Sequence, residues 1–162
     1  MDTTVMENLY HQAANLINQI IPEEWIKVYL YAEVNEDLTQ VFFYYYPDNE
    51  KEPIYSLDIT KIFDINEDDF NDLRYELNDC FEELWREFKR QKQEVWTNLT
   101  FILNSNGELK IEYGYEDLSN ENLYEQKVIW KYKHLGIRSE GEWEHRIIEE
   151  YLNSLGKTDS NK

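Results

Sequence analysis

The stretch from residue 66 to residue 88, NEDDFNDLRYELNDCFEELWREF, has the clearest hydrophobic pattern in the chain. Asn66 is a suitable N-cap. Residues 67–69 are acidic and occupy the first turn, where they favour the positive end of the helix dipole. The sequence therefore predicts a long amphipathic helix after Asn66. Its core face is an arc of about 100° formed by apolar residues at helical spacing: Phe70, Leu73, Leu77, Cys80, Phe81, Leu84 and Phe88.

Segments on either side of this helix have the composition of β-strands, because they alternate apolar and polar side chains or are rich in branched and aromatic residues. Turn residues at 35–37 and the Asn106-Gly107 step predict hairpins, which pair neighbouring strands antiparallel. The expected strands are residues 25–34, 39–46, 54–57, 95–103 and 109–115.

Helical periodicity returns at both ends of the chain, over residues 5–21, 122–134 and 142–154. We therefore expect an α+β fold with a mainly antiparallel five-stranded sheet, one long amphipathic helix in mid-chain and helices at both termini. The fold is expected to be a single domain over residues 1–155. Residues 156–162 are expected to form a flexible C-terminal tail.

Acidic residues strongly outnumber basic ones: 34 Asp and Glu against 16 Lys and Arg give a formal net charge of −18 in 162 residues. Aromatic residues make up 15% of the chain, which separates it from the aromatic-poor acidic sequences that stay disordered. Proteins that bind nucleic-acid backbones or anionic membranes use clustered Lys and Arg, so we expect no direct nucleic-acid partner and no membrane partner. A protein with a basic surface is the partner whose charge complements this acidic chain.

The N-terminal residues lack the basic start and apolar run of a signal peptide, and no segment has the ~18 consecutive apolar residues of a membrane span. A cytoplasmic location is therefore expected. Met6 is a second candidate for the first residue of the protein beside Met1.

No catalytic, cofactor or metal motif is recognisable in the sequence. The histidines His11, His134 and His145 lie in different predicted helices and lack the spacing of a zinc site. The five glycines are scattered and form no phosphate-binding loop. Cys80, the only cysteine, lies on the apolar arc of the long helix, where cysteine behaves as a small buried hydrophobe. The sequence thus predicts a protein that is not an enzyme and has neither cofactor nor metal.

The long helix also carries an ordered set of carboxylates on its polar side. Steps of three or four residues keep them within about 100° of one another. They are either a solvated face or a docking surface for a basic protein. One charge per ~5 Å of helix is sparser than the one per ~1.7 Å of duplex DNA, so close DNA mimicry is not expected. The candidate docking residues are Asp68, Asp72, Glu76, Asp79, Glu83 and Glu87.

A second candidate surface is the face of the first two strands that is opposite their aliphatic side. It is rich in tyrosine and tryptophan, the residue types that dominate binding hot spots. The alternative is that the C-terminal helices, with Trp130, Tyr132 and Trp143, cover this face. The expected members of the face are Tyr29, Tyr31, Tyr44 and Tyr46, together with Trp25 and Trp96.

Several aromatic-rich segments, in order along about residues 7–152, resemble the YezG-like immunity proteins of Bacillus and related bacteria, a family that includes the EsaG antitoxin of Staphylococcus. The number of segments makes the resemblance specific to the family. They are residues 20–25 (IIPEEW), 28–33 (VYLYAE), 83–85 (ELW), 96–101 (WTNLTF), 117–119 (DLS), 124–126 (YEQ), 130–132 (WKY) and 135–137 (LGI).

The resemblance implies an immunity protein, or antitoxin, encoded beside a secreted LXG-type toxin with a C-terminal nuclease domain. It implies neutralisation by direct protein–protein binding in the cytoplasm. The sequence leaves open whether the free protein is a monomer or a homodimer. The family supplies no catalytic motif and no assignment of toxin-contacting residues. That the carboxylates of the long helix contact the toxin is therefore a hypothesis from the residues alone.

Two alternatives stay open beside this interpretation. One is an acidic DNA-mimic regulator of a basic DNA-binding protein. The other is an enzyme that uses a carboxylate pair with Mg²⁺, which binds carboxylates and water and leaves little sequence signature. The sequence does not distinguish a DNA-cleaving from an RNA-cleaving target, nor one cognate toxin from another.

Overall fold

A computed structural model of the chain describes residues 2–48 and 52–160. Helices and strands are mixed along the chain, and the strands form one antiparallel sheet, so the expected α+β class is confirmed. The chain divides into two compact units, Met1–Glu116 and Asp117–Lys162. The first contains the sheet and its covering helices, and the second contains two helices.

The sheet of the first unit has the strand order β3-β2-β1-β4-β5, and every neighbouring pair is antiparallel. β1 lies at the centre, where Leu30 is opposite Phe43 of β2 and Phe101 of β4. The two hairpins expected from the turn residues are present. The strands are β1 (Lys27–Val34), β2 (Thr39–Tyr46), β3 (Ile54–Tyr55), β4 (Asn98–Asn104) and β5 (Leu109–Gly114).

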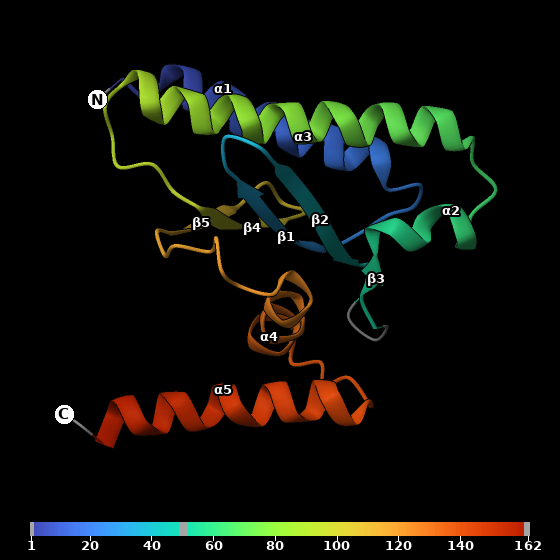
Figure 1. The fold of residues 1–162 in the computed structure, drawn as a ribbon. Helices are drawn as coiled ribbons and strands as arrows, with labels where there is room; N and C mark the ends of the chain where they lie inside the picture. Colours follow the sequence, from blue (N-terminus) through green and yellow to red (C-terminus); the bar gives the residue numbers. More distant parts are fainter. Residues whose placement is uncertain (1, 49–51, 161–162) are drawn as a thin grey trace. The chain divides into compact units, whose positions relative to one another are not determined.

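Two helices, α1 (Thr4–Ile20) and α3 (Glu67–Arg90), lie side by side over one face of this sheet (Figure 1). The Asn66 side chain accepts a hydrogen bond from the backbone N–H of Asp69 at 3.0 Å, which confirms the expected N-cap. The Cys80 thiol donates to the Leu9 carbonyl at 3.2 Å and joins the two helices.

The core lies between this helix pair and the inner face of the sheet. Burying a large apolar side chain there contributes roughly 1.5–3 kcal/mol. All the expected apolar residues of α3 are buried except Leu73, which is half-buried and packs against the same core. Phe81 of α3 meets Phe101 of β4 edge to face at 5.6 Å. The core also includes Trp85, which lies outside the expected arc and donates its indole N–H to the Trp96 carbonyl at 3.1 Å.

The segment expected as a third strand, residues 54–57, is a strand in its first half only. β3 has only two residues and is followed by a 3-10 turn, η1 (Ser56–Asp58), and a short helix, α2 (Ile59–Ile62). Ile59 is fully buried and fixes α2 on the core, while the Ser56 hydroxyl accepts from the backbone N–H of Phe43 at 3.1 Å. These long-range contacts are absent from the local pattern, which is why the sequence favours a strand.

The second unit contains α4 (Leu123–Leu135) and α5 (Glu142–Ser160), which pack through Val128, Ile147 and Ile148. Gly136 ends α4 in the left-handed region, with φ 69°, as expected for a glycine C-cap. The helix α5 extends beyond the end expected near Ser154 and includes residues 156–160 of the expected tail; residues 161–162 lie outside the described range. None of the described helices has the length and apolarity needed to cross a membrane.

Candidate functional site

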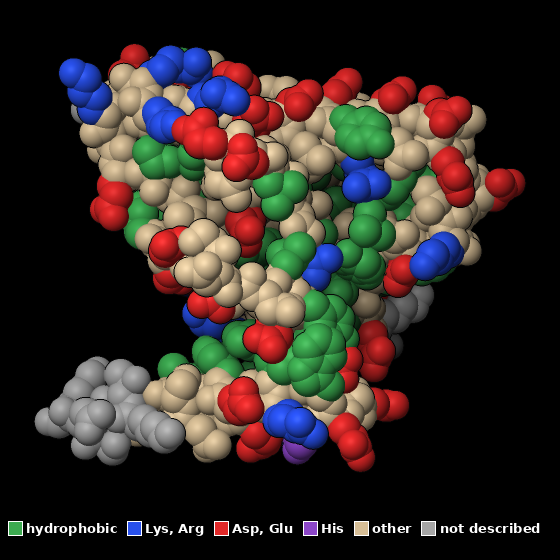
Figure 2. Space-filling view, viewed as in Figure 1, with side chains coloured by type: hydrophobic (Ala, Val, Ile, Leu, Met, Phe, Trp, Pro, Cys, Tyr) green, Lys and Arg blue, Asp and Glu red, His purple; other side chains and the backbone are tan. Residues whose placement is uncertain are grey.

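The carboxylates of α3 form an exposed acidic surface at its N-terminal half. Figure 2 shows acidic side chains gathered along the edge formed by α3. Within residues 2–48 and 52–160, four of the candidate carboxylates are exposed and take part in no ion pair. We call these four the acidic face: Asp68, Asp72, Glu76 and Asp79.

The other two candidate carboxylates are already engaged at the C-terminal end of α3. Glu87 is buried, with 8% of its surface exposed, and accepts from Arg90 Nε at 2.9 Å and Gln91 Nε2 at 2.9 Å. Bonds from Gln91 and then Arg90 hold the pKa of Glu87 below its usual value. Glu83 is exposed but pairs with Arg90 Nη2 at 3.2 Å. Helical spacing predicts Glu87 beside the other five carboxylates, but the structure buries it and binds it to the end of its own helix, so it is not part of the exposed surface.

Tyr75, an aromatic residue that the sequence analysis did not single out, lies between the carboxylates of the acidic face. Tyr75 is 58% exposed, and it follows Asp72 by three residues and precedes Asp79 by four, so all three lie on one side of α3. Tyrosine is a preferred residue of binding hot spots. Its position outside the apolar arc of α3 is the sequence signal that could have identified it.

The four tyrosines predicted for the aromatic surface do share one face of the sheet. Tyr29 is opposite Tyr44 in the register of β1 and β2, and Tyr31 and Tyr46 lie two residues away on the same side. Their rings pack with one another and with neighbouring rings: Tyr44 stacks on Tyr55 at 4.9 Å, and Tyr29 meets Tyr46 edge to face at 6.2 Å. This mutual packing gives the aromatic residues a structural role in the sheet.

Trp25 and Trp96 do not belong to this aromatic face. Trp96 is fully buried in the main core, and Trp25 packs against the same core while its indole N–H donates to Asn18 Oδ1 at 3.0 Å. β1 begins at Lys27 and β4 at Asn98, so neither tryptophan is in a strand and strict alternation does not apply to them.

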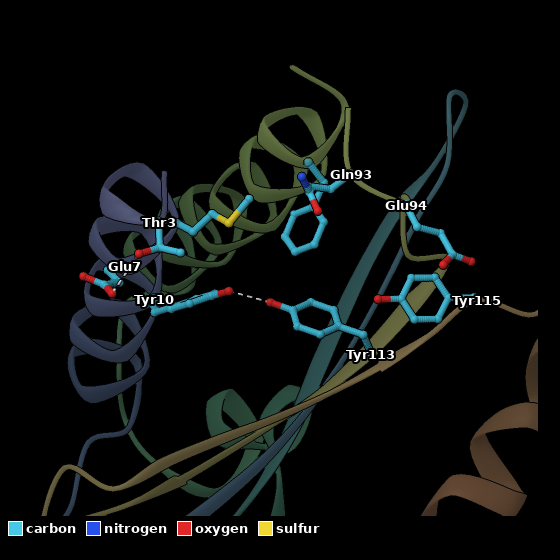
Figure 3. Close-up of a pocket in the computed structure, with 9 residues that line it drawn as sticks. Thr3, Glu7, Tyr10, Gln93, Glu94, Tyr113 and Tyr115 are labelled. Carbon is cyan, nitrogen blue, oxygen red and sulfur yellow. Dashed lines mark hydrogen bonds between the residues drawn. The ribbon is translucent and has the colours of Figure 1, made fainter. Parts of the chain in front are cut away.

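A pocket of about 500 Å³ lies between the start of α1, the end of α3 and β5 (Figure 3). Tyr10 of α1 and Tyr113 of β5 point toward one another across it, and their hydroxyl oxygens are 2.6 Å apart. Burial raises the pKa of both phenols, so both stay neutral at ordinary pH. We call this the tyrosine pocket; its lining is Thr3, Met6, Glu7, Tyr10, Phe88, Gln93, Glu94, Tyr113 and Tyr115.

The tyrosine pocket could not be read from the sequence, because its lining comes from segments about a hundred residues apart. Tyr113 is fixed by Phe88 at 5.3 Å and by Trp96 at 6.1 Å between ring centres. Asp2, which lies before α1, is held by the end of α3, since Gln91 Nε2 donates to the Asp2 carbonyl at 2.6 Å.

The three histidines lie in three different helices. His11 is in α1, His134 in α4 and His145 in α5. Burial raises the pKa of the Cys80 thiol to about 12, which keeps it protonated. In the part of the chain that the structure describes, no three His, Cys, Asp or Glu side chains are arranged to hold a metal ion.

These observations define an acidic α+β protein whose distinguishing features are an exposed carboxylate face and an aromatic pocket on one unit. Comparison with known proteins gives the family. Residues 6–149 match the family described as Immunity protein YezG-like, and the chain belongs to that family. The match spans both compact units, so the second unit is part of the family sequence.

Three relatives agree with this membership. The chain is 41% identical over 154 residues to Immunity protein YezG of Bacillus spizizenii. The aligned region covers 94% of this chain and 96% of that protein. The chain is 41% identical over 149 residues to Immunity protein YezG of Bacillus subtilis, covering 91% and 99%. It is 34% identical over 155 residues to Type VII secretion system protein EsaG of Staphylococcus aureus, covering 93% and 95%. The resemblance inferred from the sequence is confirmed.

Proposed function

We propose that this protein is an antitoxin that binds the C-terminal nuclease domain of a cognate LXG-type toxin in the cytoplasm and neutralises it by direct contact. The observation that carries the proposal is membership of a family of immunity proteins along nearly the whole chain. The protein itself performs no chemistry in this proposal; it covers or disables the surface on which the nuclease holds its substrate.

The charge of the chain supports a nuclease as the partner. A nuclease binds phosphates and is expected to be basic around its site, whereas this chain carries a net charge of −18. The four carboxylates of the acidic face are spaced by roughly 5 Å along α3, which is shorter than the ~8 Å screening length at physiological salt. They therefore act as one combined field on an approaching basic surface. Such a field raises the association rate and orients the partner.

The spacing of the acidic face also favours contact with a protein over imitation of DNA. Four charges over ~17 Å of helix are about threefold sparser than the phosphates of a duplex. Tyr75 supplies an exposed aromatic contact among them, as expected for a protein interface.

The test is co-expression of this protein with the nuclease domain encoded beside its gene. Cell survival, copurification of a one-to-one complex and loss of nuclease activity in that complex are the expected results. Cell death without a complex contradicts the proposal for that toxin. Survival without copurification contradicts neutralisation by binding, and calorimetry with Mg²⁺, Mn²⁺ and Ca²⁺ would then test the carboxylate-enzyme alternative.

A further inference from the structure

The tyrosine pocket combines aromatic walls with an acidic rim. Tyr10, Phe88, Tyr113 and Tyr115 supply the aromatic part of the lining, and Phe88 is buried while Tyr115 is 46% exposed. The pocket is therefore apolar at its base and open to solvent at its edge. A volume of about 500 Å³ is in the range of sites that enclose small organic groups.

The charged residues of the pocket are all acidic. Glu7 of α1 and Glu94, which follows α3, are exposed members of the lining, and the lining formed by residues 2–48 and 52–160 contains no Lys or Arg. The cations at the end of α3 are engaged elsewhere, since Lys89 pairs with Glu36 and Arg90 pairs with Glu83 and Glu87. Figure 3 shows Glu7 and Glu94 at opposite ends of the pocket, so the field of the rim repels an anionic group and attracts a cation from both sides.

The hydroxyl pair at the centre of the pocket adds acceptor atoms. One of Tyr10 and Tyr113 donates its hydrogen to the other, so each oxygen keeps a lone pair that can accept from a third group. A guanidinium group is planar, carries five N–H donors, stacks on aromatic faces and pairs with carboxylates. Its attraction to an aromatic face becomes stronger where water is excluded. An ammonium group has only three donors on a compact, strongly hydrated charge.

We propose that the tyrosine pocket is the anchor site for an arginine side chain of the basic partner protein. This inference rests on the proposed function, because the toxin is the partner expected to supply the arginine. It places an anchor at the C-terminal end of α3, beyond the acidic face at the N-terminal half of the same helix. The acidic face then directs the encounter and the pocket holds the complex.

The pocket can be tested on the free protein, without any toxin. The probe is N-acetyl-L-arginine amide, and the control is N-acetyl-L-citrulline amide, which has the same shape but a neutral urea group. We expect saturable NMR shifts of the Tyr10, Tyr113 and Tyr115 ring resonances with the arginine probe only, and their loss in the E7Q/E94Q variant. Equal shifts with both compounds, or no saturable shift with either, overturn the inference.

The role in the complex is tested with the same variant and the toxin nuclease domain. E7Q/E94Q should raise Kd about tenfold or more. The matched control is E52Q/E108Q, which removes two exposed carboxylates outside the pocket and outside α3. An unchanged Kd, or an equal loss in the control, overturns the anchor role while leaving the proposed function intact. If the wild-type chain forms no toxin complex but still binds the arginine probe selectively, the proposed function fails and the arginine specificity of the pocket is supported.

Discussion

The hydroxyl oxygens of Tyr10 and Tyr113 lie 2.6 Å apart and join the first helix of the chain to the last strand of its sheet. Both phenols are half-buried, and Tyr113 also packs on Phe88. The bond therefore links α1, β5 and the end of α3 at a single point.

A double-mutant cycle measures the strength of this link. Tyr10→Phe and Tyr113→Phe each remove one hydroxyl without changing the ring, and each should lower the free energy of unfolding by ~0.5–1.5 kcal/mol. The double variant should lose less than the sum of the two, because both single changes remove the same hydrogen bond. Urea unfolding followed by circular dichroism gives all three values. Strict additivity would show that the two hydroxyls do not interact in solution.

Alkaline pH should destabilise the fold through its buried tyrosines. Burial raises the pKa of Tyr31, Tyr44 and Tyr113 above the ordinary value of about 10. The unfolded chain then releases these protons at lower pH than the folded chain, so their contribution to stability is complete below about pH 10 and is lost as the pH rises above it.

The measurement is the free energy of unfolding at about pH 9 and about pH 11. The decrease between them should be smaller in Tyr113→Phe than in the wild type, because one of the perturbed phenols is absent. An equal decrease in both would contradict the assignment to Tyr113.

Removing the carboxylate of Glu87 should lower the stability of the fold, whereas removing that of Asp72 should not, although both residues belong to the same set of candidate carboxylates. Glu87→Ala removes the acceptor for Arg90 and Gln91, and Gln91 also holds the Asp2 carbonyl, so this variant should unfold at lower urea concentration. Asp72→Ala removes an exposed carboxylate outside any ion pair and should leave the midpoint nearly unchanged. A pH titration provides a second check. The pKa of Glu87 is lowered in the fold, so its stabilisation is present above the ordinary glutamate pKa and is lost as the pH falls through the folded value.

The sequence predicts those parts of the fold that are encoded locally. Asn66 and the periodic residues of α3 lie within one continuous segment, and their spacing alone is enough to define the helix and its buried face. The same holds for Asn106-Gly107 and the β4–β5 hairpin. Turn chemistry and periodicity need no knowledge of the rest of the chain.

The candidate site was predicted less completely, because its decisive contacts are between distant segments or outside regular strands. Glu87 is an exception, because Arg90 and Gln91 follow it by three and four residues, and helical spacing alone predicts that they reach its carboxylate. The alternation that would place Trp96 on the aromatic face begins only at Asn98. The Tyr10–Tyr113 pair requires α1 and β5 to be neighbours, which no local pattern of the sequence shows.

Tyr75 and Phe81 separate a binding role from a structural role on the same helix. Phe81 is 1% exposed and packs on Phe101, so Phe81→Ala should cost ~3–5 kcal/mol of stability. Tyr75→Ala should leave the urea midpoint unchanged but raise Kd for the toxin nuclease domain by about tenfold, as for a hot-spot tyrosine. Calorimetric titration of the two folded proteins measures the second effect. An unchanged Kd would place Tyr75 outside the interface.

Charge reversal of the acidic face tests its part in the encounter with the toxin. The variant D72K/E76K/D79K changes three exposed side chains outside any ion pair and should leave the fold intact. The association rate at low salt should fall by about tenfold or more, and the remaining rate should depend less on salt, because the field that steers the basic partner has been removed. Stopped-flow measurements at several salt concentrations give both quantities. The control E24K/E52K/E108K makes the same change in net charge outside α3, so an equal effect in both variants would assign steering to the total charge of the protein instead of to this face.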